Sequence, residues 1–408
     1  MSNGNSTGRA WAVTIFFTLF MAVMTYNLII FPACAVDTMN VFGVGQAELT
    51  TLSSVTSVVG VFAGILFGRM LDTKSVRKSI MIFLAIGVVL FFARAFVTAY
   101  VPVMVLTFLA SLSVGICQVA GPKVVGTWFP AEKVGTATSF LTAGAGIGSA
   151  GGFALGAILG IHNGLLSVGI AYLVLLVFWI AVGDEGPYKV VIPPEAVEAS
   201  KKGASKVYSS PSLWMIIIAY SMAVTSSLLI NSYMINAFVS KGLDPAGASA
   251  MGTLLNLCLM AGGFIMTAIL GVTKRFNILV TIAMLGGAIF VLAGWFLPVS
   301  SITFVLVALG GLFFGGSLGL CVGRVPLLPM TGQFGPENIG SAMGFTETIK
   351  GVISFLMPIV VANVLGTNFN AIFIVFAVCC AITIVCGAFL VPELGEKGKL
   401  FQQQAAKK

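Results

Sequence analysis

The stretch Phe129-Pro-Ala-Glu-Lys-Val-Gly-Thr-Ala-Thr-Ser-Phe140 decides the architecture, because it recurs without a gap as Phe334-Gly-Pro-Glu-Asn-Ile-Gly-Ser-Ala-Met-Gly-Phe345. The equivalence extends upstream, where Gly115-Ile-Cys117 aligns with Gly319-Leu-Cys321. Each copy stands at the same place within its half of the chain. The repetition predicts two equivalent halves, and parallel repeats of this kind are typical of membrane transporters.

Composition places both halves in a membrane. The chain is 58% hydrophobic and 8% charged, whereas soluble domains carry about 25% charged residues. So few charges could not cover the surface of a soluble protein of 408 residues. The seven cysteines lie in apolar runs and are interpreted as small packing residues. We therefore expect an all-α integral membrane protein.

Apolar runs long enough to cross a bilayer contain about 20 residues. Two sets of six such runs predict twelve transmembrane helices in two pseudo-symmetric six-helix bundles, residues 1–183 and 212–408, joined by a polar connector at 184–211 that we expect to be cytoplasmic. The predicted spans are 10–35, 47–71, 78–100, 102–128, 134–159, 163–183, 212–239, 245–272, 277–297, 301–329, 339–365 and 369–391.

The distribution of lysine and arginine over the loops predicts the orientation, because cytoplasmic loops are enriched in these residues. With the N-terminus inside, the outer loops carry only Lys241. The inner loops carry Lys74, Arg77, Lys78, Lys133, Lys189, Lys201, Lys202, Lys206, Lys274 and Arg275. We therefore expect a multi-pass protein of the cell membrane, most simply a bacterial plasma membrane, with both termini in the cytoplasm.

The loop after the second span reads Gly68-Arg-Met-Leu-Asp72-Thr-Lys-Ser-Val-Arg77-Lys78. Its bases also suit ordinary positive-inside anchoring. The spacing resembles the loop signature of the major facilitator superfamily, in which a glycine and an aspartate precede a basic cluster. The resemblance implies the major facilitator fold and a conformational latch formed by Gly68, Asp72, Arg77 and Lys78.

Charges inside the apolar runs point to the substrate. Outside the loop motif, the runs contain four cations, whereas Glu347 is the one acid well inside a run; the cations are Arg94, Lys123, Arg324 and Lys350. A charge at bilayer depth costs about 2.5–3.5 kcal/mol and is a functional-site hypothesis by default. An excess of positive charge in a low-dielectric interior favours anions.

Each of the four cations has more than one role that the sequence allows. Lys350 is a candidate substrate-binding cation or an internal partner of Glu347, three residues earlier on the same helix face, and Glu347 is the proton-coupling candidate. Arg324 is a candidate second anion contact, since a guanidinium can hold a carboxylate by two hydrogen bonds. Lys123 could contact the substrate, or it could be a charge of the inner gate that extends toward the membrane surface. Arg94 could extend toward the membrane surface in the same way or pair with a neighbouring helix.

Uncharged polar residues inside the spans are candidates to orient a ligand. They are Tyr26 in the first span, Gln118 in the fourth and Asn231 in the seventh. Each is equally suited to a hydrogen bond between helices.

A narrower resemblance, carried by Phe345, Lys350 and Gly366-Thr-Asn-Phe369 together with Trp128-Phe129-Pro130, is to the oxalate:formate antiporter and monocarboxylate-transporter-like branch. It implies that Lys350 binds the substrate carboxylate and that Gln118 and Tyr26 line the site. The eighth span carries no charge, although the branch has an arginine there, and Glu347 replaces an aromatic residue.

These features predict a secondary active transporter of a small organic anion, a mono- or dicarboxylate. It would work by alternating access as an anion exchanger or a proton symporter. The alternatives are a proton-coupled exporter of drugs or other hydrophobic compounds and a non-transporting membrane sensor. The sequence contains no nucleotide-binding loop, metal cluster, catalytic triad or basic stripe with exposed aromatics. We expect no enzyme activity, cofactor or nucleic acid, and a monomer in membrane lipid.

Overall fold

The computed structural model describes residues 3–56, 67, 71, 75–129, 131–184, 186, 205–335 and 338–394. The regular structure of these residues is helical, and ten of their helices are long and apolar enough to cross a membrane. One of the ten, α8 (Ala131–Val182), runs through two of the spans predicted from the sequence. The expected all-helical membrane fold is confirmed.

The described chain forms two compact units. The first contains residues Met1–Val191 together with Asn231–Asn256 and Pro358–Thr367. Its complete helices are α1 (Asn3–Ala33), α2 (Ala35–Phe42), α3 (Gln46–Val55), α6 (Val76–Ala95), α7 (Tyr100–Gly126) and α8.

The second unit contains Ile192–Ile230, Leu257–Met357 and Asn368–Lys408, in so far as these are described. Three long helices, α10 (Pro211–Ser240), α11 (Pro245–Thr273) and α15 (Ile339–Leu365), contribute residues to both units. The helices that lie within the second unit are α12 (Phe276–Phe296), α13 (Ser301–Phe314), α14 (Ser317–Val322), the 3-10 helix η3 (Val325–Thr331), α16 (Phe369–Ile384) and the short π-helix η5 (Val385–Phe389).

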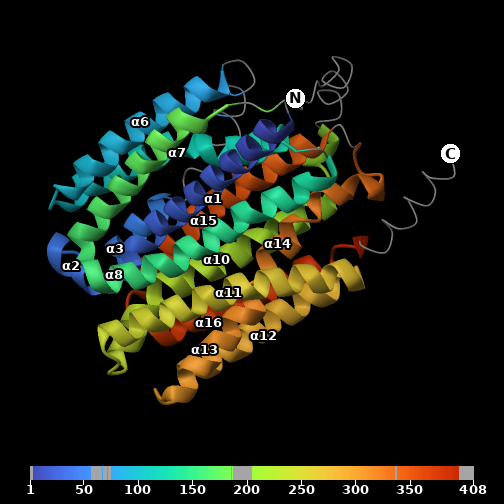
Figure 1. The fold of residues 1–408 in the computed structure, drawn as a ribbon. Coiled ribbons are helices and arrows are strands. Elements are labelled where there is room, and N and C mark those ends of the chain that lie inside the picture. Colours follow the sequence, from blue (N-terminus) through green and yellow to red (C-terminus); the bar gives the residue numbers. More distant parts are fainter. Residues whose placement is uncertain are drawn as a thin grey trace. The chain divides into compact units, whose positions relative to one another are not determined.

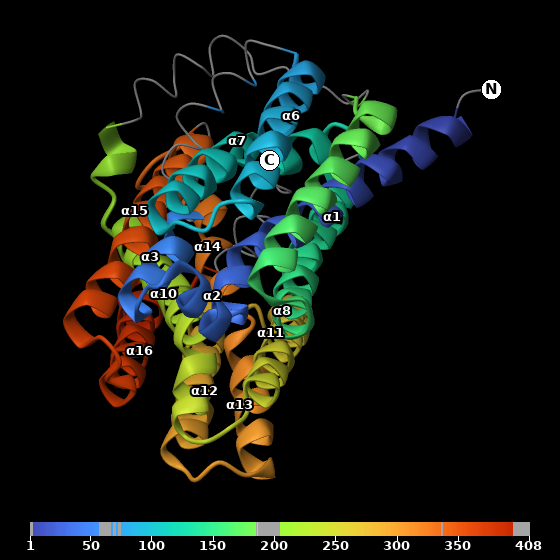
Figure 2. The same cartoon turned by 90° about the vertical axis from the view of Figure 1, so that its left-hand side faces the viewer.

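Close packing of α1 against α8 organises the first unit (Figures 1 and 2). A Cβ atom at Gly144 would lie 2.1 Å from the backbone oxygen of Thr18, and one at Gly148 would lie 1.9 Å from that of Ala22. Only glycine allows two backbones to approach so closely. Gly144 and Gly148, which lie in the fifth predicted span, therefore pack directly against the first helix.

The helix α8 bends at Gly160, where φ is +67°. The carboxylate of Asp37 accepts a hydrogen bond of 2.6 Å from the backbone N–H of Ile161, the first residue after the bend. Such a carboxylate satisfies a free donor and complements the helix dipole at the start of a helical segment. The bend separates the two spans that the sequence predicts.

Polar contacts explain why the segment Asn231–Asn256 belongs to the first unit. The amide of Asn236 on α10 donates to Gln46 Oε1 on α3 at 2.5 Å, and the Ser249 hydroxyl on α11 donates to the backbone oxygen of Phe153 on α8 at 2.6 Å. We call these two contacts the seam. Gln46, Asn236 and Ser249 are all buried.

We predict that Gly148→Ala lowers the thermal unfolding temperature of the purified protein in detergent. The added methyl group overlaps a backbone oxygen, and overpacking of this kind costs at least about 1–3 kcal/mol. Gly151→Ala is the matched control, because a Cβ at Gly151 meets no atom within 4 Å. Equal unfolding temperatures for the two variants would contradict the close approach of α1 and α8.

Candidate functional site

Lys350 lies near the middle of α15, in the second unit. Its Nζ atom is 2.5 Å from Oε2 of Glu347, one turn earlier on the same helix. The Lys350 side chain is 14% exposed and the Glu347 side chain is 34% exposed. The pair is thus formed as the sequence allows, and its acidic member is the more accessible of the two.

Tyr220 on α10 completes this cluster. The Nζ atom of Lys350 lies 5.5 Å from the centroid of the Tyr220 ring, which is within the range of a cation–π contact. The Tyr220 hydroxyl is within hydrogen-bonding reach of the Glu347 carboxylate. The sequence analysis did not identify Tyr220; the available signal was a tyrosine in the seventh predicted span, the span that also contains Asn231.

The electrostatic state of the cluster follows from its composition. The ammonium of Lys350 and the carboxylate of Glu347 neutralise each other, and the tyrosine contributes a polarisable ring and a hydroxyl. One ammonium carries three N–H donors, so Lys350 can donate to a further oxygen acceptor beside Glu347 or in its place. The cluster can therefore bind an anion by exchanging one carboxylate for another.

Arg324 is also in the second unit, but other groups hold its guanidinium. Its side chain is fully buried at the junction of α14 and η3. It donates to Asn277 Oδ1 on α12 at 3.1 Å, and to the backbone oxygen of Gly387 on η5. The guanidinium also lies 5.4 Å from the Phe276 ring centroid. These contacts give Arg324 a role in packing α12 against the end of the last span.

The remaining predicted ligand contacts lie in the first unit. Tyr26 and Ser167 share a hydrogen bond of 2.5 Å between their hydroxyl oxygens, and Asn231 accepts one of 2.9 Å from Asn256. Both side chains thus connect helices in this structure. Gln118 is half-buried on α7, and the exposed Lys123 donates to the backbone oxygen of Leu71 at 3.3 Å.

Arg94 is a fully buried cation of the first unit. Its guanidinium donates to Asn27 Oδ1 on α1 at 2.6 Å and to the Thr107 hydroxyl on α7 at 3.4 Å. The ring of Phe91 lies 4.6 Å from the guanidinium carbon. Of the two roles that the sequence allows, the contacts correspond to helix pairing.

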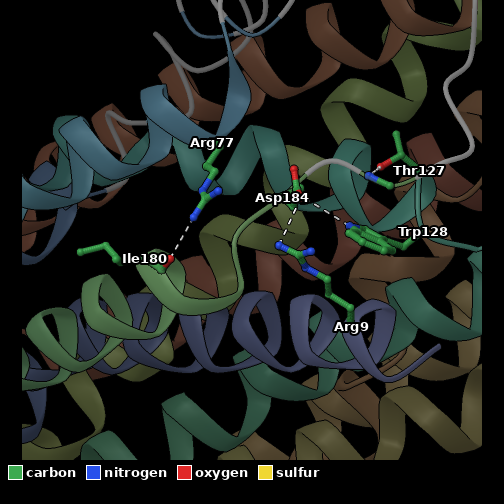
Figure 3. Close-up of polar contacts among 7 residues, drawn as sticks. Arg9, Arg77, Thr127, Trp128, Ile180 and Asp184 are labelled. Carbon is green, nitrogen blue, oxygen red and sulfur yellow. Dashed lines mark hydrogen bonds and ion pairs between the residues drawn. The ribbon is translucent and has the colours of Figure 1, made fainter. Parts of the chain in front are cut away.

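Gly68 and Asp72 of the predicted latch lie outside the described residues. Arg77 is exposed and donates to the backbone oxygen of Ile180 at 3.1 Å, at the end of α8 (Figure 3). Lys78 is exposed at the start of α6.

A second group of contacts lies nearby in Figure 3. Arg9 forms an ion pair of 3.2 Å with Asp184, whose backbone oxygen accepts a hydrogen bond from the Trp128 indole at 3.2 Å. These contacts tie the ends of α1, α7 and α8 together.

The long apolar helices, the glycine-mediated packing and the charges held inside the spans are typical of a polytopic membrane transporter. The sequence matches the Major Facilitator Superfamily over residues 15–358. The chain belongs to this family of transporters. A search of curated proteins gave no match.

Solved structures with the same fold cover nearly the whole chain at low sequence identity. A bacterial homologue of the human lysosomal transporter Spinster, inward-facing and unoccupied, has a TM-score of 0.70 at 12% identity, covering 96% of this chain and 95% of its own. A D-xylose–proton symporter has a TM-score of 0.71 at 15% identity, covering 94% and 98%. A mutant of the nucleoside transporter NupG has a TM-score of 0.73 at 12% identity, covering 94% and 98%.

We predict that Arg94→Met lowers the unfolding temperature of the protein in detergent. The substitution removes two donors and leaves the buried acceptors of Asn27 and Thr107 unpaired, at a cost of about 1–3 kcal/mol for each acceptor. Arg77→Met is the control, because Arg77 is exposed and its side chain donates to a backbone oxygen, that of Ile180. The structural role of Arg94 is refuted if both variants unfold at the wild-type temperature.

Proposed function

We propose that this protein is a secondary transporter of a small organic anion, a mono- or dicarboxylate, and that Lys350 binds the substrate carboxylate. The observation that carries the proposal is an ammonium near the middle of a transmembrane helix, partly accessible and neutralised by a carboxylate that can be exchanged. Fixed charges of this kind inside a membrane protein mark substrate pathways.

Transport proceeds by alternating access in this proposal, as anion exchange or as symport with a proton. Glu347 is the group that takes up the proton in this proposal, because it is one-third exposed and loses its partner when the substrate carboxylate takes its place beside Lys350. Gln118, Tyr26 and Asn231 orient the substrate, the last two in conformations where their present hydrogen bonds to Ser167 and Asn256 open. We leave Arg324 out of the binding set, since its side chain is fully buried and its Nε and Nη1 atoms donate to Leu320, Asn277 and Gly387. Its Nη2 atom has no hydrogen-bond partner in the described part of the chain.

The proposal includes the expected environment of the protein. It acts as a monomer in a bacterial plasma membrane, with both termini and the connector at 184–211 in the cytoplasm. The loop motif with Gly68, Asp72, Arg77 and Lys78 is its latch. The excess of lysine and arginine in alternate loops supports this orientation.

We predict that Lys350→Gln abolishes or weakens carboxylate binding by roughly ten- to hundred-fold, since it removes a charge-assisted hydrogen bond. The measurement is a thermal-shift titration of the purified protein with formate, lactate, oxalate and succinate, because a ligand that binds the folded state raises its stability. Lys206→Gln is the comparison variant, because Lys206 is an exposed lysine of the second unit outside the predicted spans. Carboxylate binding that survives in Lys350→Gln rules out the site and favours the exporter of hydrophobic compounds.

We predict that Glu347→Gln abolishes uptake driven by a pH gradient and leaves anion exchange intact. The glutamine side chain does not titrate, so it cannot carry a proton across, and its neutral amide no longer competes with the substrate for Lys350. Proteoliposomes loaded with lactate measure both activities in the same preparation. If uptake retains its wild-type dependence on the pH gradient, Glu347 is not the proton carrier. Absence of flux in either assay with the wild-type protein points to a sensor.

A further inference from the structure

We infer that Tyr220 is the positioning residue of the anion site. Its ring holds the ammonium of Lys350, and its hydroxyl holds the Glu347 carboxyl group when a substrate carboxylate takes the place of Glu347 beside Lys350. The inference rests on the proposed function of Lys350 and deepens it, because it assigns a substrate charge and a proton count to the same site.

The geometry gives Tyr220 both contacts at once. Its ring lies 5.5 Å from Nζ of Lys350, and its hydroxyl reaches Glu347, one helical turn away from Lys350. Tyr220 belongs to α10, whereas the other two residues belong to α15. The contact across the two helices therefore fixes where the ammonium and the carboxylate can lie.

Charge balance determines what the site can bind. The Lys350–Glu347 pair is neutral, so a bound carboxylate leaves the site with a net charge of about −1 at bilayer depth, where charge is expensive. One proton on Glu347 restores neutrality. The site therefore carries one singly charged carboxylate together with one proton, or exchanges one such anion for another. A dicarboxylate retains one uncompensated charge there, so the expected substrate class is a monocarboxylate.

The hydroxyl of Tyr220 can serve Glu347 in both of its protonation states. A phenol donates to an ionised carboxylate and accepts from a protonated carboxyl group. When the substrate displaces Glu347 from Lys350, the hydroxyl therefore remains as its partner. Among the described residues, a further titratable group that interacts electrostatically with Tyr220 is the buried thiol of Cys321 on α14, which lies near Arg324.

Two substitutions separate the two functions of Tyr220. Tyr220→Phe keeps the ring and removes the hydroxyl, so lactate affinity stays within about two-fold of wild type. Loss of a donor to the ionised carboxylate favours its protonated form, and the pH at which lactate uptake falls to half its maximum rises by roughly one unit. Tyr220→Leu removes the ring as well, and lactate affinity falls about five-fold.

The test uses the full chain in proteoliposomes, with labelled lactate and succinate and a trapped pH indicator that counts protons. The wild-type protein is expected to take up one proton with each lactate and to prefer lactate to succinate. Tyr233→Phe is the matched control, since Tyr233 is a buried tyrosine of the same helix in the other unit. It is expected to keep the wild-type pH profile.

The outcomes distinguish this inference from the proposed function. A wild-type pH profile in Tyr220→Phe, or shifts of equal size in Tyr220→Phe and Tyr233→Phe, overturns the role of Tyr220. A preference for succinate over lactate, with one proton per substrate, overturns the assignment of a singly charged substrate. In these cases loss of lactate binding in Lys350→Gln still supports the anion site. If lactate binding persists in Lys350→Gln, both proposals fail.

Discussion

A charged side chain inside a membrane must find its partners within the protein, because lipid supplies none. The described chain meets this constraint in two ways. Arg94 and Arg324 are fully buried and donate to neutral groups, the amides of Asn27 and Asn277 among them. Lys350 is instead paired with the carboxylate of Glu347 and is partly accessible. The arginine contacts join helices, and the lysine contact joins two residues of one helix.

This difference decides which cation suits a transported anion. Removing a neutral acceptor from a buried arginine leaves an unpaired charge and separates the helices that it connects. Replacing Glu347 by another carboxylate leaves the lysine paired and the packing of α15 unchanged. In the proposed transport cycle Lys350 can thus change partners, while Arg94 and Arg324 hold together the helices that they connect.

The sequence predicted the membrane-spanning helices better than the side-chain contacts between them. Apolar run length depends on local composition, so the spans follow from it. The sequence could indicate the pairing of Glu347 with Lys350, because residues three apart share a helix face. The acceptors of Arg324 and the ring of Tyr220 come from other helices, and helix crossing angles, which the sequence does not encode locally, set those contacts. For the same reason, Tyr26 and Asn231 could not be separated from ordinary interhelical hydrogen bonds.

The seam bears on how easily the proposed alternating access can occur. Gln46, Asn236 and Ser249 connect helices of the first predicted half to segments of α10 and α11 through neutral hydrogen bonds. Each such bond contributes only about 0.5–1.5 kcal/mol, and water can replace it once the seam opens. Ion pairs at these positions would have to be desolvated when the seam closes, and their attraction would resist its opening. Neutral side chains at the seam therefore add less to the free energy of opening than buried ion pairs at the same positions would.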